Sequence, residues 1–284
     1  MPIAHLSDRA LITVGGAEAE HFLQNLVTAD LARLEAGEAR PSALLTPQGK
    51  VMFDFLISRD GDGFALDVAA PLAADFRKRL MLYRLRARVE ISEPDESVVA
   101  VSWGNDSSLG QPGALADRRF PAGANVRRSH APQEADADEA AWHRLRIAHG
   151  VAESGDDFAA GDTFPHDILY DFNGGIGFGK GCFVGQEVVS RMQHRGTARR
   201  RVLTVSSATP LPAPGTAVEA GGRPIGTLGT VSGTDGLAIL RIDRAKAAMD
   251  KGVPILAGDA ELTLAIPEWA GFGFPEGSAE ADDS

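Results

Sequence analysis

The sequence predicts an α+β protein in which a mixed region of helices and strands precedes a smaller all-β domain. Three observations predict this class. The chain has 284 residues, which is long enough for about two domains. Its hydrophobic fraction of 44% and charged fraction of 24% are those of a globular protein. Segments with helix-like and with strand-like spacing of apolar residues both occur before Gly196, whereas the sequence after Gly196 contains only short strand-like runs.

The first elements predicted are a strand and a helix. Ala10–Val14 is a β-prone apolar run, and Gly15 and Gly16 end it. Ala17–Leu34 predicts an amphipathic helix, because its apolar residues recur at helical spacing, at Phe22, Leu23, Leu26 and Val27.

Two hairpins are predicted next. The turn Thr46–Gly49 separates strand-like runs at Leu44–Leu45 and Val51–Ile57, since its Pro and Gly suit a tight turn. Asp60–Gly63 predicts a second turn, which leads into a strand at Phe64–Val68.

A second helix is predicted to begin at Pro71, with one apolar face formed by Leu72, Phe76, Leu80 and Tyr83. Less regular structure follows it. We expect strands near Arg88–Ile91 and Val98–Trp103, loops and weak edge structure over Gly104–Ala141, and part of a helix over Trp142–Ala148.

Short β-prone runs separated by Gly and Pro turns make up the sequence after Gly196. They predict a small antiparallel barrel or a sandwich. The runs are Val202–Ser206, Ala217–Glu219, Ile225–Val231, Leu237–Ile242 and Glu261–Ile266. We therefore predict a mixed region over residues 1–196, an all-β domain over 197–270 and a disordered acidic tail over 271–284.

The charge and cysteine content exclude several classes of protein. A net charge of −11 argues against a general binder of duplex nucleic acid or of an anionic membrane. The single cysteine, Cys182, cannot form an internal disulfide or hold a closed metal site alone, so no resident metal is expected. No secretory signal or membrane-spanning run is recognisable. These features predict a cytoplasmic protein.

The segment Gly174–Gly196 is the most informative stretch of the chain. It is rich in glycine, and a helix is predicted to start near Val184–Gly185. Cys182 would then lie just before a helix N-terminus and two residues from Lys180, and both features favour a thiolate. A small buried hydrophobic residue is an equally good interpretation of Cys182.

Basic residues cluster at two places without an intervening acid. The first cluster is Arg77, Lys78, Arg79, Arg84, Arg86 and Arg88. The second is Arg191, Arg195, Arg199, Arg200 and Arg201, with His194 among them. Each pattern is typical either of an anion-binding site or of a solvated face. For the first cluster the solvated face is the stronger interpretation.

The run Lys180–Glu187, KGCFVGQE, resembles the K-G-C-[YF]-x-G-Q-E motif of the YgfZ family of folate-binding proteins. This family is related to the glycine-cleavage T-protein, a folate-dependent aminomethyltransferase. Further matches are Thr28-Ala29-Asp30, Gln48-Gly49-Lys50 and Arg195-Gly196, so the resemblance covers about residues 6–267.

The resemblance implies two α+β lobes and a C-terminal β-barrel around a folate-sized channel. It also implies binding of tetrahydrofolate or a derivative, and a role in assembly or repair of iron–sulfur proteins, with a link to cluster-dependent tRNA modification. Any cluster would be transient and shared with an assembly or client protein, because one thiol cannot complete the coordination.

The resemblance also assigns roles to residues. Cys182 would act as a thiolate with Lys180 as its electrostatic support. Gln186 and Glu187, at the helix start, would be orienting groups of the cofactor-binding site. Trp142 would stack on the pterin ring, and Arg191 or Arg195 would bind a folate carboxylate.

An alternative function is that of a tetrahydrofolate-dependent aminomethyl or one-carbon transferase, with Asp54 as the catalytic carboxylate. The sequence departs from T-proteins here. Phe53-Asp54 stands where they carry two aspartates, and Cys182 stands where they tend to have Asp. These departures argue against glycine cleavage. A scaffold that only binds partners is the third hypothesis.

Overall fold

The computed structural model describes residues 2–104 and 113–275. The chain divides into two compact units, each built from several stretches of sequence. The first unit consists of Met1–Trp142, Ala160–Pro165 and Asn173–Arg191, and the second of His143–Ala159, His166–Phe172 and Met192–Ser284. The division predicted at residues 196 and 270 stays a prediction. Residues 276–284 of the predicted tail lie outside the described residues.

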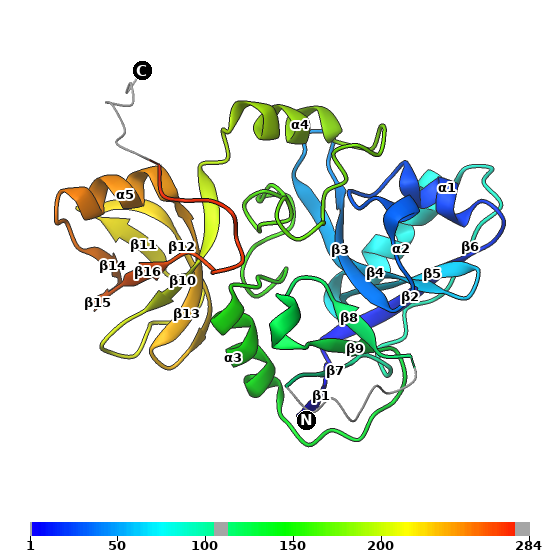
Figure 1. Cartoon of the computed structure of the whole chain (residues 1–284), viewed down its shortest axis with the longest axis horizontal. Coiled ribbons are helices and arrows are strands. Elements are labelled where there is room, and N and C mark those ends of the chain that lie inside the picture. Colours follow the sequence, from blue (N-terminus) through cyan, green and yellow to red (C-terminus); the bar gives the residue numbers. More distant parts are fainter. Residues whose placement is uncertain (1, 105–112, 276–284) are drawn as a thin grey trace. The chain divides into compact units, whose positions relative to one another are not determined.

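The first unit is built on a sheet that has nine strands within the described residues, in the order β1-β7-β9-β8-β3-β4-β5-β2-β6 (Figure 1). Its strands are β1 (Ile3–His5), β2 (Arg9–Gly15), β3 (Glu38–Leu45), β4 (Val51–Asp60), β5 (Gly63–Ala69), β6 (Glu90–Ile91), β7 (Ala100–Ser102), β8 (Leu115–Asp117) and β9 (Arg127–Ser129), with a helical turn η2 (Ala122–Ala124). Strands β3 and β8 are parallel, and the other neighbours are antiparallel. Both predicted hairpins, β3–β4 and β4–β5, are confirmed.

Helix α2 (Ala70–Arg84) covers one face of this sheet and completes its apolar core. The Phe76 ring centroid lies 5.0 Å from that of Phe53 and 4.8 Å from that of Phe55. Because residues alternate between the faces of a strand, Asp54 points to the opposite face of β4 from these two rings. The helix predicted to begin at Pro71 is confirmed.

The helix predicted over Ala17–Leu34 is wrong for most of its length. Helix α1 (Ala19–Gln24) has six residues, and a short helical turn, η1 (Leu31–Arg33), follows after a break. In the break, Val27 forms a β-bridge with Leu44, and the Thr28 N–H donates to the Ala43 carbonyl at 2.9 Å. The apolar residues Leu26 and Val27 are therefore buried against β3 from a non-helical backbone, because a partner strand outweighs helical periodicity.

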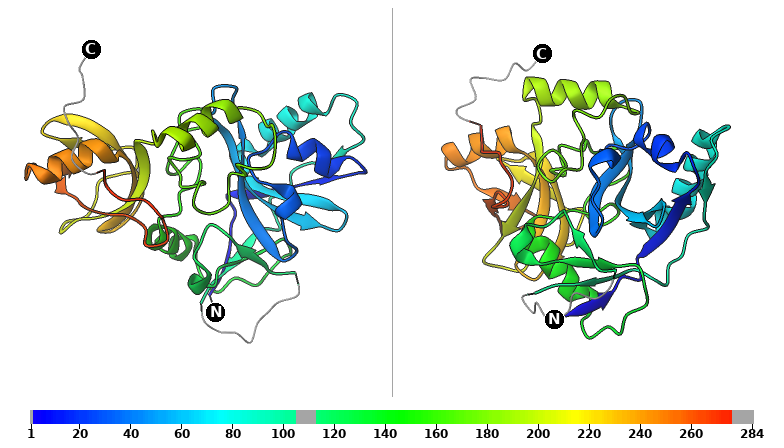
Figure 2. Two further views of the ribbon diagram at one scale, coloured as in Figure 1. Left: turned by 45° about the horizontal axis from the view of Figure 1, so that its top comes forward. Right: turned by 45° about the vertical axis from the view of Figure 1, so that its right-hand side comes forward.

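The second unit contains an antiparallel barrel with the strand order β15-β14-β11-β12-β13-β10-β16. Its strands are β10 (Arg200–Ser206), β11 (Ala217–Ala220), β12 (Arg223–Ser232), β13 (Asp235–Arg241), β14 (Ile255–Ala257), β15 (Ala260–Glu261) and β16 (Thr263–Ala265). Helix α5 (Ile242–Asp250), orange in Figure 2, was not predicted from the sequence. Its residues Ile242, Ala245 and Ala248 are buried in the barrel core.

Arg146 ties helix α3 (Glu139–His149) to the loop that follows it and to the barrel. Its buried guanidinium lies 2.8 Å from Asp157 and 3.2 Å from Glu153, and it donates to the Thr230 hydroxyl at 3.1 Å. Asp157 also accepts a hydrogen bond from the Thr230 N–H at 2.7 Å. These contacts fix residues 143–159 within the second unit.

None of the helices formed by residues 2–104 and 113–275 combines the length and the apolar character needed to cross a bilayer.

Candidate functional site

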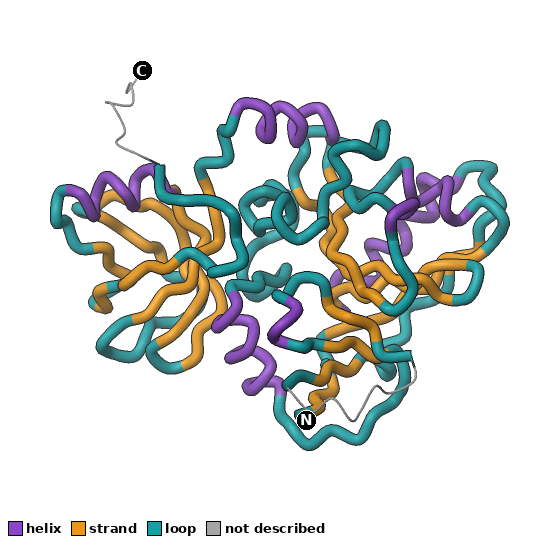
Figure 3. Tube along the Cα trace, in the orientation of Figure 1, coloured by secondary structure: helices purple, strands orange, loops and turns teal. Residues whose placement is uncertain are grey.

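Cys182 lies exposed in a long loop that ends where helix α4 (Gln186–Arg195) begins. Figure 3 shows that almost the whole path from α3 to α4 is loop. The predicted helix start is confirmed to within two residues. An exposed thiol does not fit the alternative in which Cys182 is a small buried hydrophobic residue.

Lys180 anchors this loop to the segment that follows α1. Its Nζ donates to the carbonyls of Val27 at 2.6 Å and of Ala29 at 2.7 Å. Burial lowers the pKa of Lys180 to about 8, and the nearby Asp30 carboxylate opposes this shift. The Gly177 N–H adds a bond of 2.8 Å to the Thr28 carbonyl. The amine of Lys180 is thus engaged in holding the loop in place.

A contact between backbones holds the loop on its other side. Gly185, at a φ of +78°, packs against the β3–β4 turn, where an added Cβ would lie 2.6 Å from the Thr46 carbonyl oxygen and 3.1 Å from the Gly49 Cα. At Gly49 an added Cβ would lie 2.9 Å from the Val188 Cβ. Because Gly185 and Gly49 have no side chains, the loop and the β3–β4 turn can approach more closely than side chains at these positions would allow.

Gln186 closes the short turn after Cys182. Its Oε1 accepts from the Phe183 N–H at 3.3 Å, and its own N–H donates to the Phe183 carbonyl at 3.2 Å. Phe183 is buried, whereas Glu187 is exposed in the first turn of α4. Together, Lys180, Gln186 and Gly185 hold a loop that presents Cys182 to solvent.

The other predicted site residues lie elsewhere in the fold. Arg191 and Arg195 are exposed on α4, and neither has an ion-pair partner among the described residues. Asp54 is buried in β4, opposite Ala43 in the strand register.

Trp142 is only 1% exposed. The Arg128 guanidinium lies 4.9 Å from its ring centroid, and the rings of Phe120 and Trp103 lie 5.5 Å and 6.4 Å away. A pterin could therefore stack on Trp142 only if its present neighbours moved.

A hollow of about 350 Å³ lies in the second unit, beside Gln193 and the C-terminal segment around Phe272. Arg201 lines it and forms a buried two-pronged ion pair with Asp171, with distances of 2.8 and 2.9 Å. Its guanidinium lies 5.1 Å from the ring centroids of both Phe172 and Phe272. The exposed Arg199 also lines the hollow, without an ion-pair partner among the described residues.

His166 lines the same hollow and was not predicted as a site residue. It is buried, and its Nε2 lies 3.2 Å from the Gln193 Oε1. Burial lowers the pKa of His166, with Arg201 acting in the same direction and Asp171 opposing it. A neutral imidazole is therefore favoured here. The one feature of the sequence that could have indicated His166 as a site residue is that an aspartate, Asp167, directly follows it.

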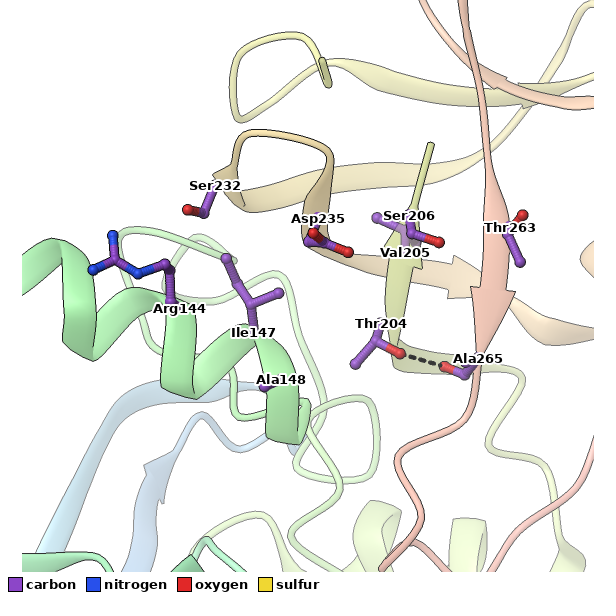
Figure 4. A pocket seen from close by; sticks show the side chains of 10 residues that line it. All are labelled: Arg144, Ile147, Ala148, Thr204, Val205, Ser206, Ser232, Asp235, Thr263 and Ala265. Carbon is purple, nitrogen blue, oxygen red and sulfur yellow. Dashed lines mark hydrogen bonds between the residues drawn. The ribbon is translucent and has the colours of Figure 1, made fainter. Parts of the chain in front are cut away.

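A second hollow of this unit, of about 380 Å³, lies between α3 and the barrel strands (Figure 4). Ile147 and Ala148 line it from the helix, and Ser206 and Thr263 from β10 and β16. The Thr204 hydroxyl, also in its lining, donates to the Ala265 carbonyl at 3.2 Å. None of the predicted site residues lines this hollow.

Residues 199–272 match the model of the C-terminal β-barrel domain of CAF17. The chain is 31% identical over 231 residues to the iron-sulfur cluster assembly factor IBA57 homolog, mitochondrial, of Neurospora crassa, covering 71% of this chain and 52% of the relative. It is 32% identical over 240 residues to the Chaetomium globosum homolog, covering 71% and 55%.

The human relative, iron-sulfur cluster assembly factor IBA57, mitochondrial, is 28% identical over 303 residues, covering 93% of this chain and 84% of the relative. The chain spans about half the length of the two fungal relatives. These relatives carry the name IBA57 and not YgfZ.

The relatives' names also contradict the predicted cytoplasmic location, because each is named as a mitochondrial protein. That prediction relied on the single cysteine and on the lack of a recognisable secretory signal or membrane-spanning run, and it was wrong. A single cysteine indicates a reducing environment but cannot distinguish one reducing compartment from another.

The solved structure of aminomethyltransferase T of the glycine cleavage system from Bartonella henselae matches with a TM-score of 0.71 and 19% identity, covering 93% of this chain and 84% of that chain. The predicted fold class is thereby confirmed. The chain has the fold of a glycine-cleavage aminomethyltransferase, with a C-terminal β-barrel similar to that of CAF17, and its sequence relatives are iron–sulfur cluster assembly factors.

Proposed function

We propose that this chain is an iron–sulfur cluster assembly factor of the YgfZ and IBA57 type, which contributes Cys182 as one ligand of a cluster shared with a partner protein. The names of the relatives support the assembly role. The observation that carries the proposal is the exposure of Cys182 on a loop held from both sides by Lys180 and Gly185.

The cluster is cargo in this proposal, and the chain is an incomplete ligand set for it. A cluster needs about four thiolate or equivalent ligands, and the chain has one cysteine. Partner thiols or a small-molecule thiol must supply the others. A fixed loop reduces the conformational entropy lost when Cys182 binds, so anchoring by Lys180 and Gln186 favours transient binding by a single ligand.

We also propose that the chain binds a tetrahydrofolate. Its donor groups fit the carboxylates of the folate tail, because Arg195 and Arg199 are exposed cations without ion-pair partners among the described residues. Arg199 lines the 350 Å³ hollow, where Phe272 offers an aromatic wall. Arg191 is the second candidate on α4. The buried Trp142 does not fit an open stacking face.

Cluster binding is tested by anaerobic reconstitution of the full chain with ferrous iron, sulfide and excess glutathione. We expect the wild type to take up a cluster, seen as visible absorption and iron content, and Cys182→Ser to lose at least about 90% of it, because removing one of about four ligands opens the site. Met249→Ser, at an exposed position on α5, is the control and should retain the cluster. Equal cluster content in wild type and Cys182→Ser would contradict the proposal.

Folate binding is tested separately by calorimetry with tetrahydrofolate. We expect Arg195→Ala and Arg199→Ala each to weaken binding by about tenfold, equivalent to about 1.4 kcal/mol. Met249→Ser again serves as the control. Unchanged affinity in both arginine variants would remove the folate assignment and leave the cluster proposal standing.

A further inference from the structure

The end of helix α2 exposes two large apolar side chains that the core does not use. Leu82 is 63% exposed and Leu85 is 86% exposed, the two highest values among the large apolar side chains of the described residues. Leu82 lies in the last turn of α2, and Leu85 is the residue that directly follows the helix. With Lys78, Arg79, Arg84 and Arg86 they form what we call the α2 surface.

Leu85 occupies a backbone conformation that normally requires glycine. Its φ is +46° and its ψ is −105°. The Arg84 carbonyl accepts from the Ala87 N–H at 2.8 Å, so Leu85 is the second residue of a tight turn of the type II′ class. A leucine in this position strains the backbone. Because the side chain is almost fully exposed, burial within the chain does not compensate for that strain.

A hollow of about 360 Å³ adjoins Leu82. Its apolar lining includes Phe53, Leu72 and Leu82, and its polar lining includes Asp75, Lys78 and Arg79. The volume is at the lower end of the range for ligand pockets. It is therefore large enough to receive an apolar side chain of a bound segment. The residues next to that side chain in the segment would then contact Lys78 and Arg79.

The charges along the last part of α2 and just after it are strongly unlike those of the whole chain. The chain has a net charge of −11, whereas residues 77–88 carry six Lys or Arg and no acid. Arg77 and Arg88 pair with Glu93 and Glu18 at 2.7 Å and 3.3 Å. The other four cations, which belong to the α2 surface, have no ion-pair partner among the described residues: Lys78, Arg79, Arg84 and Arg86.

We propose that the α2 surface docks an acidic segment of a partner protein, with one apolar side chain of that segment seated in the hollow beside Leu82. The unpaired cations would contact the acidic groups, and Leu85 would extend the apolar contact. A nucleic acid offers the charge without an apolar side chain, and the net charge of −11 opposes a long polyanion. A bilayer is flat and leaves the hollow unused. This inference requires neither Cys182 nor a folate.

The test measures fluorescence anisotropy with the full chain and two labelled helical peptides. Both peptides carry glutamates along their length. The anchored peptide has Leu and Phe on one face, and the anchorless peptide has Ala at those two positions. We expect the anchored peptide to bind at least about tenfold more tightly. Equal affinity for the two peptides would overturn the proposal.

Two variants locate the binding. The double variant Leu82→Ser/Leu85→Gly should weaken the anchored peptide by about tenfold, and Lys78→Glu/Arg79→Glu should weaken both peptides to a similar extent. Leu85→Gly also relieves the turn strain, so loss of binding by that variant is not loss of the fold. Met249→Ser on α5 and Arg223→Glu/Lys251→Glu at exposed positions of the second unit are the matched controls and should bind like wild type.

Two further arms distinguish the other anionic partners. These are vesicles of phosphatidylcholine with phosphatidylserine, and a single-stranded RNA. Tighter binding to either than to the anchored peptide, lost in Lys78→Glu/Arg79→Glu, would overturn the proposal. Weaker binding of both, together with the expected peptide preference, would support it.

Discussion

Replacing Gly185 by alanine tests whether the loop that carries Cys182 is held by direct backbone contact. The β3–β4 turn packs so closely on Gly185 that an added Cβ would lie 2.6 Å from the Thr46 carbonyl oxygen and 3.0 Å from the Leu45 Cβ. Both neighbours belong to a tight hairpin of the sheet and cannot move aside like the end of a flexible side chain.

Two effects set the expected magnitude. Gly185 has a φ of +78°, and a side chain in the left-handed region costs about 1–2 kcal/mol. Forcing extra volume into a packed contact costs about 1–3 kcal/mol more. We therefore expect Gly185→Ala to lower the free energy of unfolding by about 3 kcal/mol, equivalent to about 6–12 °C in Tm for a unit of this size.

Two neighbouring glycines provide matched controls for urea and thermal unfolding. Gly181 has a φ of +94° but nothing within 4 Å of an added Cβ, so Gly181→Ala should show the conformational cost alone, about 1–2 kcal/mol. At Gly179 the φ lies outside the left-handed region and the space is also open, so Gly179→Ala should change stability by less than about 0.5 kcal/mol. If Gly185→Ala is no more destabilising than Gly181→Ala, the contact with the turn is not what holds the loop.

Three further predictions concern single side chains. Arg201→Met should destabilise the chain by about 3–5 kcal/mol in urea unfolding, because it leaves the buried Asp171 carboxylate without its ion pair; a loss below about 1 kcal/mol would contradict this. Because burial lowers the pKa of Lys180 to about 8 from its ordinary 10.5, the unfolded chain holds more protons between these values. The free energy of unfolding of wild type minus that of Lys180→Met should thus rise between pH 8 and 10.5, by at most about 1.4 kcal/mol per pH unit. A difference that falls with pH in this range would refute the prediction. Cys182→Ser should change stability by less than about 0.5 kcal/mol, since the thiol is exposed, and should abolish reaction with a thiol reagent; a larger loss would mean that Cys182 is structural.

Local pattern was sufficient wherever an element depends on its own residues. The turns at Thr46–Gly49 and Asp60–Gly63 carry their own Pro or Gly, and both hairpins form as predicted. Pro71 and the apolar spacing after it specify α2. The start of α4 followed similarly from the glycine-rich run and the residues after it.

Periodicity failed where a distant partner competes with it. The stretch around Val27 has helical spacing, yet a bridge to Leu44 keeps it out of the helix. Residues 147–179 contain no Lys or Arg, so spacing alone does not indicate the partners of the acidic residues between 153 and 171. The structure pairs Asp157 with Arg146 and Asp171 with Arg201, across 11 and 30 positions of the chain.

The sequence by itself determined the α+β class and the β-rich C-terminal part, and it singled out the segment around Cys182 as a candidate site, because each depends on local composition and spacing. Only the tertiary structure decided how that segment is held. Lys180 binds carbonyls about 150 positions away, and Gly185 meets a turn near residue 46. Contacts of this kind depend on which surfaces meet after folding, and no local pattern specifies them. For the same reason the sequence could indicate a cationic run at 77–88 but not that Leu82 and Leu85 are exposed beside it.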